Sequence, residues 1–133
     1  MIEINSKIKS KIPEKLIRET VEKFFQVYKI KNKTVSVAFI GDKKMRDLNR
    51  EYRKKDKTTD VLSFSGEDDF FGEILICYQQ IKRQAKEYKK TAKQELIFIL
   101  VHGLLHLIGM TDETENGRIK MIETGDKFIS RIK

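Results

Sequence analysis

Residues 93 to 112 read Lys93-Gln94-Glu95-Leu96-Ile97-Phe98-Ile99-Leu100-Val101-His102-Gly103-Leu104-Leu105-His106-Leu107-Ile108-Gly109-Met110-Thr111-Asp112. This is the most apolar stretch of the chain, and it holds the only two histidines, four positions apart. Such a run, apolar on all sides, predicts a buried central helix. On a helix, a spacing of four places both imidazoles on one face, one turn apart.

Two imidazoles on one helical face supply half of a tetrahedral zinc site. Gly109 suits the left-handed position just past a helix end, and the turn it makes can bring Asp112 back toward the histidines. His102, His106 and Asp112 would then supply three ligands and leave a fourth position open for water, which is typical of catalytic zinc. The alternative is a pair of core histidines in a polar network. The spacing alone leaves both interpretations open.

Two neighbouring positions bear on the chemistry of this helix. A zinc-peptidase helix has Glu after its first histidine as general base, whereas this chain has Gly103. Glycine inside a helix lowers the stability of the helix by about 1 kcal/mol relative to alanine. We therefore expect that another group approaches the backbone closely at Gly103. We also expect that the absence of a side chain leaves room for substrate near the metal. Glu95 lies seven residues before His102. It could accept a hydrogen bond from an imidazole, or lie on the surface.

Length and composition indicate a soluble protein with one domain over residues 1–133. The chain has no repeat and no linker rich in proline or glycine, and 36% of its residues are charged. Its net charge of +8 favours polyanionic partners, above all nucleic acid. The apolar run is too short to span a bilayer, the N-terminus has no signal-peptide core, and one cysteine, Cys77, forms no internal disulfide. These features favour the cytoplasm and no membrane partner.

Hydrophobic periodicity predicts the other elements. We expect strands over residues 1–5, 34–40, 61–64 and 72–77, and helices over 14–28, 42–52, 78–90 and 114–132 on either side of the histidine helix. We expect Asp42 to cap the second helix and Cys77 to be a core thiol on a strand. The order β, α, β, α, β, β, α, α, α predicts an α+β fold, in which a small mixed sheet packs against several helices.

A second informative stretch reads Asn49-Arg50-Glu51-Tyr52-Arg53-Lys54-Lys55-Asp56-Lys57-Thr58-Thr59-Asp60-Val61-Leu62-Ser63-Phe64. Its first part is a polar, basic loop. Arg53, Lys54, Lys55 and Lys57 are suited to binding phosphate. The alternative is a solvated turn whose lysines serve solubility, and the loop taken alone favours that alternative.

The two stretches occur together in a known pattern. His102-Gly103-Leu104-Leu105-His106-Leu107-Ile108-Gly109 resembles the signature of the YbeY family of bacterial endoribonucleases and rRNA maturation factors. Asn49-x-x-Tyr52-Arg53-x-x-Asp56-x-x-Thr59-Asp60-Val61-Leu62-Ser63-Phe64 resembles the second motif of that family. Similar residues also stand at Gly72-Glu73-Ile74, Gln84-Ala85 and Glu95. The resemblance covers most of residues 35 to 112.

The resemblance implies a zincin-like fold, a cytoplasmic location and one Zn²⁺ held by three side chains. It implies cleavage of single-stranded RNA in 16S rRNA 3′-end maturation and ribosome quality control, with the small ribosomal subunit and ribosomal proteins as partners. His102 and His106 match the first two ligand positions. The third family ligand is the histidine of a Gly-Tyr-Asp-His ending, and Asp112 occupies its position here, with Glu113 and Glu115 as substitutes if the loop is displaced.

Arg53 matches the functional arginine of the family, and Thr58 and Glu73 stand where the family usually has Pro and Asp. We therefore expect metal-assisted phosphodiester cleavage. Arg53 would stabilise the negative charge that develops on the phosphorane, and Arg53, Lys54, Lys55 and Lys57 would bind RNA. Two alternatives remain: a non-catalytic ribosome-assembly factor that binds RNA and has a structural metal, and a metal-dependent peptidase.

Overall fold

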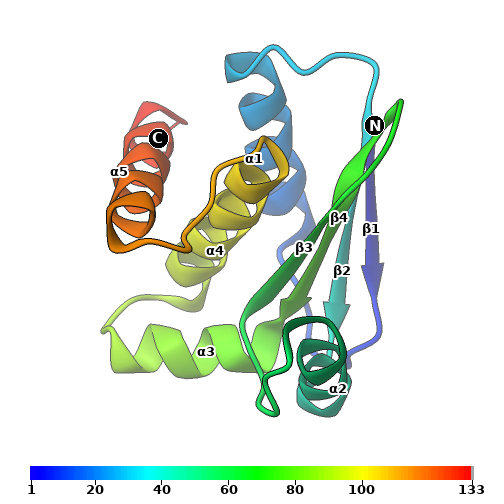
Figure 1. Cartoon of the computed structure of the whole chain (residues 1–133), viewed down its shortest axis with the longest axis vertical. Coiled ribbons are helices and arrows are strands. Elements are labelled where there is room, and N and C mark those ends of the chain that lie inside the picture. The colour runs from blue at the N-terminus through cyan, green and yellow to red at the C-terminus, as the bar shows by residue number, and fades with distance from the viewer. Residues whose placement is uncertain (133) are drawn as a thin grey trace.

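The computed structural model describes residues 1–132, which form an α+β fold around one mixed sheet (Figure 1). The strands are β1 (Ile2–Ser6), β2 (Thr34–Ile40), β3 (Val61–Ser65) and β4 (Phe70–Cys77), in the spatial order β1-β2-β4-β3. Strands β1, β2 and β4 are mutually parallel, whereas β3 runs antiparallel to β4 and forms one edge of the sheet. The described part of the chain has five helices, α1 (Glu14–Val27), α2 (Asp42–Arg53), α3 (Tyr78–Glu87), α4 (Ala92–Leu107) and α5 (Glu115–Ile132). The predicted fold class and order of elements are confirmed.

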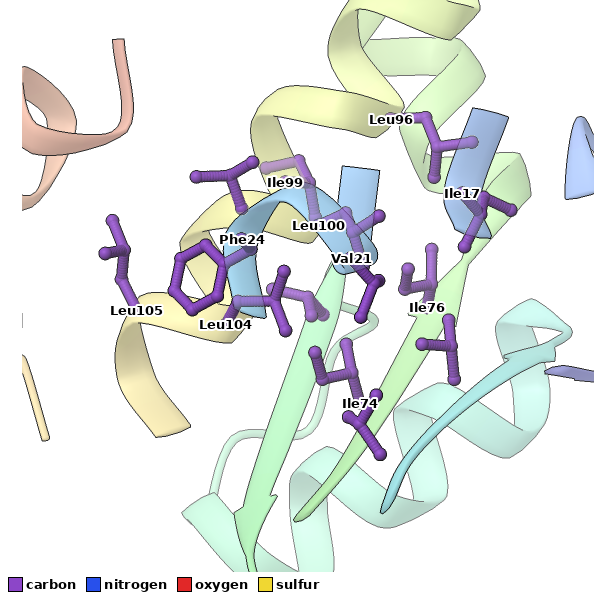
Figure 2. Packing of buried hydrophobic residues seen from close by; sticks show 14 of the residues in the cluster. Ile17, Val21, Phe24, Ile74, Ile76, Leu96, Ile99, Leu100, Leu104 and Leu105 are labelled. Carbon is purple, nitrogen blue, oxygen red and sulfur yellow. The ribbon is translucent and has the colours of Figure 1, made fainter. Parts of the chain in front are cut away.

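Helices cover both faces of the sheet, because side chains alternate along each strand. On one face, Ile74 and Ile76 of β4 belong to the same buried hydrophobic cluster as Phe24 of α1 and Leu100 of α4 (Figure 2). On the other face, a smaller cluster joins α2 to the sheet; it consists of Ile40, Met45, Leu62, Leu75 and Cys77. Cys77 is therefore a buried thiol at the end of a strand, as predicted.

Helix α4 is the central helix, and it packs against α1, α3, α5, β3 and β4. It begins at a capping box: Thr91 Oγ1 accepts the backbone N–H of Gln94 at 3.1 Å, and the Gln94 side chain accepts the backbone N–H of Thr91 at 2.9 Å. Between its two ends, α4 carries apolar side chains on nearly all sides, as expected for a buried helix. Within residues 1–132, no helix combines the length and the apolarity that crossing a membrane requires.

The end of α4 is a Schellman turn, which confirms the role predicted for Gly109. Gly109 has a φ of 100°, and its N–H donates to the carbonyl of His106 at 3.0 Å. The N–H of Met110 donates to the carbonyl of Leu105 at 3.1 Å. These two bonds define the motif, and they reverse the chain so that the following residues return over the C-terminal part of α4.

Helix α3 ends at Glu87, three residues before its predicted end, and two other local predictions were wrong. Strand β4 begins at Phe70, two residues before the predicted start, because the turn that joins it to β3 is shorter than the acidic composition of residues 66–71 indicated. Asp42 does not cap α2, whose N-cap is Gly41. The Asp42 carboxylate instead accepts a hydrogen bond from the Arg83 guanidinium of α3 at 2.7 Å, a partner that is distant in sequence.

Gly125 in α5 is a position where alanine should stabilise the fold. A Cβ there would lie 3.6 Å from Val101 and 3.7 Å from Leu105, which are ordinary van der Waals contacts. We expect Gly125→Ala to raise the free energy of unfolding by about 0.5–1 kcal/mol, because alanine loses less conformational entropy than glycine when the helix forms. The midpoint of denaturant unfolding measures this change. Gly109→Ala is the control and should destabilise, because its φ of 100° strains any L side chain. A shift in the same direction for both variants would contradict this account.

Candidate metal centre

His102, His106 and Asp112 form one cluster at the C-terminal part of α4 and the turn that follows. One ligand atom from each residue lies within 4.8 Å of the others. Nε2 of His102 is 3.3 Å from Oδ2 of Asp112, and Nε2 of His106 is 3.6 Å from the same oxygen. The two imidazole rings are nearly perpendicular, with centroids 4.8 Å apart. The predicted juxtaposition of the three side chains is therefore present.

The donor atoms fit a tetrahedral metal. In a site with bonds of about 2.0–2.1 Å, two ligand atoms are separated by about 3.3 Å, which is close to both distances from Asp112. His106 Nδ1 lies 3.1 Å from the carbonyl oxygen of Met110. A carbonyl only accepts, so the proton of a neutral His106 is on Nδ1 and the Nε2 lone pair faces the carboxylate. A cation or a proton between these two acceptors is needed to offset their repulsion.

Asp112 is held in its ionised form by the two imidazoles. Partial burial raises the pKa of its carboxyl, but the hydrogen bond with His102 and the positive charge that each imidazole carries when it is protonated outweigh that effect and leave the pKa below its usual value. An ionised carboxylate is the form that binds a metal. The two other acidic residues considered as substitutes, Glu113 and Glu115, do not belong to the cluster.

The cluster opens into a cavity of about 810 Å³ that is lined by several elements. Arg53, the last residue of α2, lines this cavity together with the cluster. Arg118 of α5 also lines it. No sequence pattern predicted this role, because it depends on how α5 folds back beside α4. Within residues 1–132, neither arginine forms an ion pair. The cavity therefore combines a candidate metal centre with two guanidinium groups suited to an anion.

The cavity extends around the edge of the sheet at β3. Val61 and Ser63 alternate along this strand with Leu62 and Phe64, and all four line the cavity. Ser63 lies on the α4 side, where its hydroxyl donates to the carbonyl of Gly103 at 3.2 Å. Phe64 lies on the α2 side, packed against the smaller core cluster. An extended ligand could therefore contact both sides of the edge strand.

The close approach predicted at Gly103 is present, but its purpose differs from the expected one. A Cβ at Gly103 would lie 3.1 Å from Ser63 Oγ, 3.2 Å from Ile74 and 3.4 Å from Val61. Gly103 is buried against the sheet. The expectation that it leaves room for substrate is therefore wrong, and glycine instead allows α4 to lie close to β3 and β4.

Glu95 does not pair with an imidazole, and it does not lie on the surface. Its side chain is about 2% exposed. It accepts hydrogen bonds from Gln84 Nε2 at 2.9 Å and from Lys90 Nζ at 3.4 Å. Gln84 also donates to Asp60 at 3.1 Å, and Asp60 lines the cavity. Glu95 therefore helps to fix α3, α4 and the start of β3, and both expected roles were wrong.

The basic loop is ordered by contacts with α2. Asp56 accepts hydrogen bonds from Arg46 at 2.9 Å and from Arg50 at 3.3 Å, and the buried Asn49 donates to the carbonyl of Lys57 at 2.8 Å. Three exposed cations of this loop, Lys54, Lys55 and Lys57, form no ion pair within residues 1–132 and do not line the cavity. The structure thus places Arg53 at the cavity and the three lysines outside it.

Comparisons with known proteins agree on one family. The model of the family described as Endoribonuclease YbeY matches residues 2–133. Endoribonuclease YbeY of Thermodesulfovibrio yellowstonii is 40% identical over 125 residues, which cover 86% of this chain and 79% of that protein. Endoribonuclease YbeY of a Sulfurihydrogenibium species is 33% identical over 137 residues, with coverage of 97% and 90%.

A solved structure shows a similar fold. The solution structure of TM1509 from Thermotoga maritima superposes with a TM-score of 0.69 at 29% identity. The superposition covers 99% of this chain and 89% of TM1509. The similarity therefore extends over the sheet and over the helices that hold the cluster.

Proposed function

The chain belongs to the YbeY family of endoribonucleases, and on that basis we propose that it hydrolyses single-stranded RNA at the cavity beside α4. One observation carries the proposal: His102, His106 and Asp112 share a cavity with Arg53 and Arg118. Within residues 1–132 neither guanidinium has a carboxylate partner, and two such groups beside a candidate metal cluster are suited to a phosphodiester. A phosphodiester requires charge stabilisation as its negative charge develops in the transition state.

The metal that these residues would hold is Zn²⁺, one per chain. Two imidazoles and one carboxylate are a known ligand set for catalytic zinc, although the added negative charge can shift the preference toward harder cations. When bound, the ion would act as a Lewis acid and lower the pKa of water. The Met110 carbonyl fixes the tautomer of His106, so this ligand is oriented before the metal arrives.

Arg53 is the proposed catalytic arginine. It ends α2, an element fixed to the sheet through Met45, so its guanidinium is presented from a rigid support. A planar guanidinium can donate two parallel hydrogen bonds to a phosphate, which positions the group and offsets the negative charge of the transition state. Arg118 reaches the same cavity from α5 and would bind a second phosphate oxygen or the neighbouring phosphate.

The lysines outside the cavity would bind the RNA backbone on either side of the cleaved bond. Lys54, Lys55 and Lys57 lie on a loop that Asp56 and Asn49 hold in place. An ordered basic loop loses less conformational entropy when it binds than a mobile loop would. Binding through these lysines, together with the net charge of +8, should weaken steeply with salt.

The cellular role that we propose is maturation of the 3′ end of 16S rRNA and ribosome quality control. The family resemblance of the two motifs supports this role, and the basic surface is compatible with ribosomal RNA. The protein would then act in the cytoplasm as a single domain over residues 1–133, with the small ribosomal subunit and its proteins as partners.

Two alternatives make different predictions. A binding factor with a structural metal would bind RNA and lose thermal stability without metal, but would cut nothing. A metal-dependent peptidase could use the edge of β3, whose backbone pairs only with β4 within residues 1–132, to align an extended peptide. Gly103, however, stands where such an enzyme would have its general base.

The decisive experiment compares substrates before and after metal removal. Protein without a metal-binding tag would be stripped with a chelator, reloaded with zinc, and incubated with single-stranded RNA, the same RNA in a duplex, single-stranded DNA and a peptide library. We expect zinc-dependent cleavage of the single-stranded RNA alone. Intact RNA that is nevertheless bound would favour the binding factor, and cleaved peptides would favour the peptidase.

A further inference from the structure

Tyr52 is an exposed aromatic residue beside the candidate metal centre. Its relative exposure is 59%. Within residues 1–132 it is one of six exposed large hydrophobic residues, which are Met1, Tyr52, Phe70, Tyr88, Ile108 and Ile119. Single exposed hydrophobic residues are common and need no explanation. Tyr52 differs from the other five because it lines the cavity that holds the metal cluster.

The ring of Tyr52 is held in place by a second aromatic ring. Phe64 of the edge strand meets it edge to face, with centroids 5.1 Å apart and an interplanar angle of 68°. Phe64 is itself partly buried against the smaller core cluster. The Tyr52 ring is therefore oriented in advance while much of its surface stays open, which lowers the entropic cost of stacking on a flat ligand.

The residue after Tyr52 is the proposed phosphate-binding Arg53, and both line the same cavity. The Cα atoms of consecutive residues are about 3.8 Å apart. A nucleotide joins a flat base to a phosphate through one sugar. A phosphate bound at Arg53 therefore brings an adjoining base within reach of Tyr52.

We propose that Tyr52 stacks on an unpaired base of the substrate and so selects single-stranded RNA. The inference rests on the proposed function, since it names the feature of RNA that this site recognises. A base within a duplex is covered on both faces by its neighbours, whereas an unpaired base can turn one face to an aromatic side chain. Every base has such a face, so stacking gives a preference for single strands without a preference for sequence.

Fluorescence tests the contact directly, because the chain contains no tryptophan. Tyr52→Trp would introduce a single indole at the site. Tyr88→Trp is the matched control, since Tyr88 is 56% exposed and does not line the cavity. Both full-length variants would be titrated first with single-stranded oligouridylate and then with the duplex that oligouridylate forms with oligoadenylate. A chelator would be present so that no RNA is cut. We expect single-stranded oligouridylate to quench the tryptophan fluorescence of Tyr52→Trp but not that of Tyr88→Trp. The duplex should quench the fluorescence of neither variant.

Affinity measurements provide the second readout. Base stacking contributes about 1–3 kcal/mol per base, so Tyr52→Ala should weaken oligouridylate binding roughly 5- to 150-fold. Tyr52→Phe should bind like the wild type, and Tyr88→Ala should also be unchanged. Absence of quenching in Tyr52→Trp, equal quenching by the duplex, or unchanged affinity in Tyr52→Ala would overturn the proposal. Failure of the proposed function would appear separately, as a zinc-loaded wild type that cuts no RNA even though Tyr52→Trp is quenched.

Discussion

Replacing Asp112 with alanine should remove the bound metal and abolish RNA cleavage while leaving the fold intact. Asp112 Oδ2 lies within 3.6 Å of both imidazole Nε2 atoms, so its loss leaves two of the three proposed ligands. Loss of an outer-shell partner alone costs about 10- to 100-fold in metal affinity, and loss of a ligand should cost more. Because the Asp112 side chain is 39% exposed, we expect little change in stability of the metal-free protein.

The measurement is elemental analysis of protein purified without a metal-binding tag, followed by zinc titration and RNA cleavage on the same samples. Glu113→Ala is the matched control, because Glu113 also lines the cavity but lies outside the cluster. It should keep both metal and activity. Asp112→His should keep the metal as well, since three imidazoles form a sound zinc site.

A wild type that binds no zinc, even after zinc is added, would contradict the metal assignment. The two histidines and Asp112 would then form a polar network at the wall of the cavity, with no metal. RNA binding without cleavage would in that case become the better explanation of the cavity. A metal-loaded Asp112→Ala with full activity would instead show that the carboxylate is not a ligand.

The parts of the site that the sequence predicted are those that depend on local structure. Once the segment is helical, the spacing of His102 and His106 places both imidazoles on one face. Gly109 then determines the direction of the chain over the next few residues. The return of Asp112 therefore depends on one turn, whose two hydrogen bonds lie within residues 105–110. The same locality explains why the order of helices and strands was predictable.

The residues that were misjudged or missed depend on contacts between distant elements. Gly103 was given a role at the metal because its neighbour in sequence is a histidine, but the packing of α4 on the sheet determines its surroundings. Glu95 lies on the same helical face as His102, but Gln84 of α3 satisfies its carboxylate. Arg118 reaches the cavity only because α5 folds back beside α4. No periodicity within a single segment contains this information.

Replacing Arg53 with alanine should lower the rate of RNA cleavage by about 10²- to 10³-fold, which is the effect of removing one donor to the transition state. Arg53 lines the cavity but is not part of the metal cluster, so zinc content should stay at the level of the wild type. Arg53→Lys keeps the charge but loses the planar pair of donors, and we expect it to recover only part of the rate. Measurements of kcat, KM and zinc content on single-stranded RNA distinguish this effect from metal loss.

Lys54→Ala is the matched control for Arg53, because Lys54 is the next residue, is exposed, and does not line the cavity. It should leave kcat unchanged and weaken RNA binding, with the slope of log affinity against log salt reduced by about 0.7 for one lost phosphate contact. The two variants would thus distinguish the role of Arg53 in the rate of cleavage from the role of Lys54 in RNA binding. If Arg53→Ala cut RNA at the wild-type rate while folded and zinc-loaded, Arg53 would have no catalytic role. The charge-stabilising role would then pass to Arg118, the second arginine at the cavity.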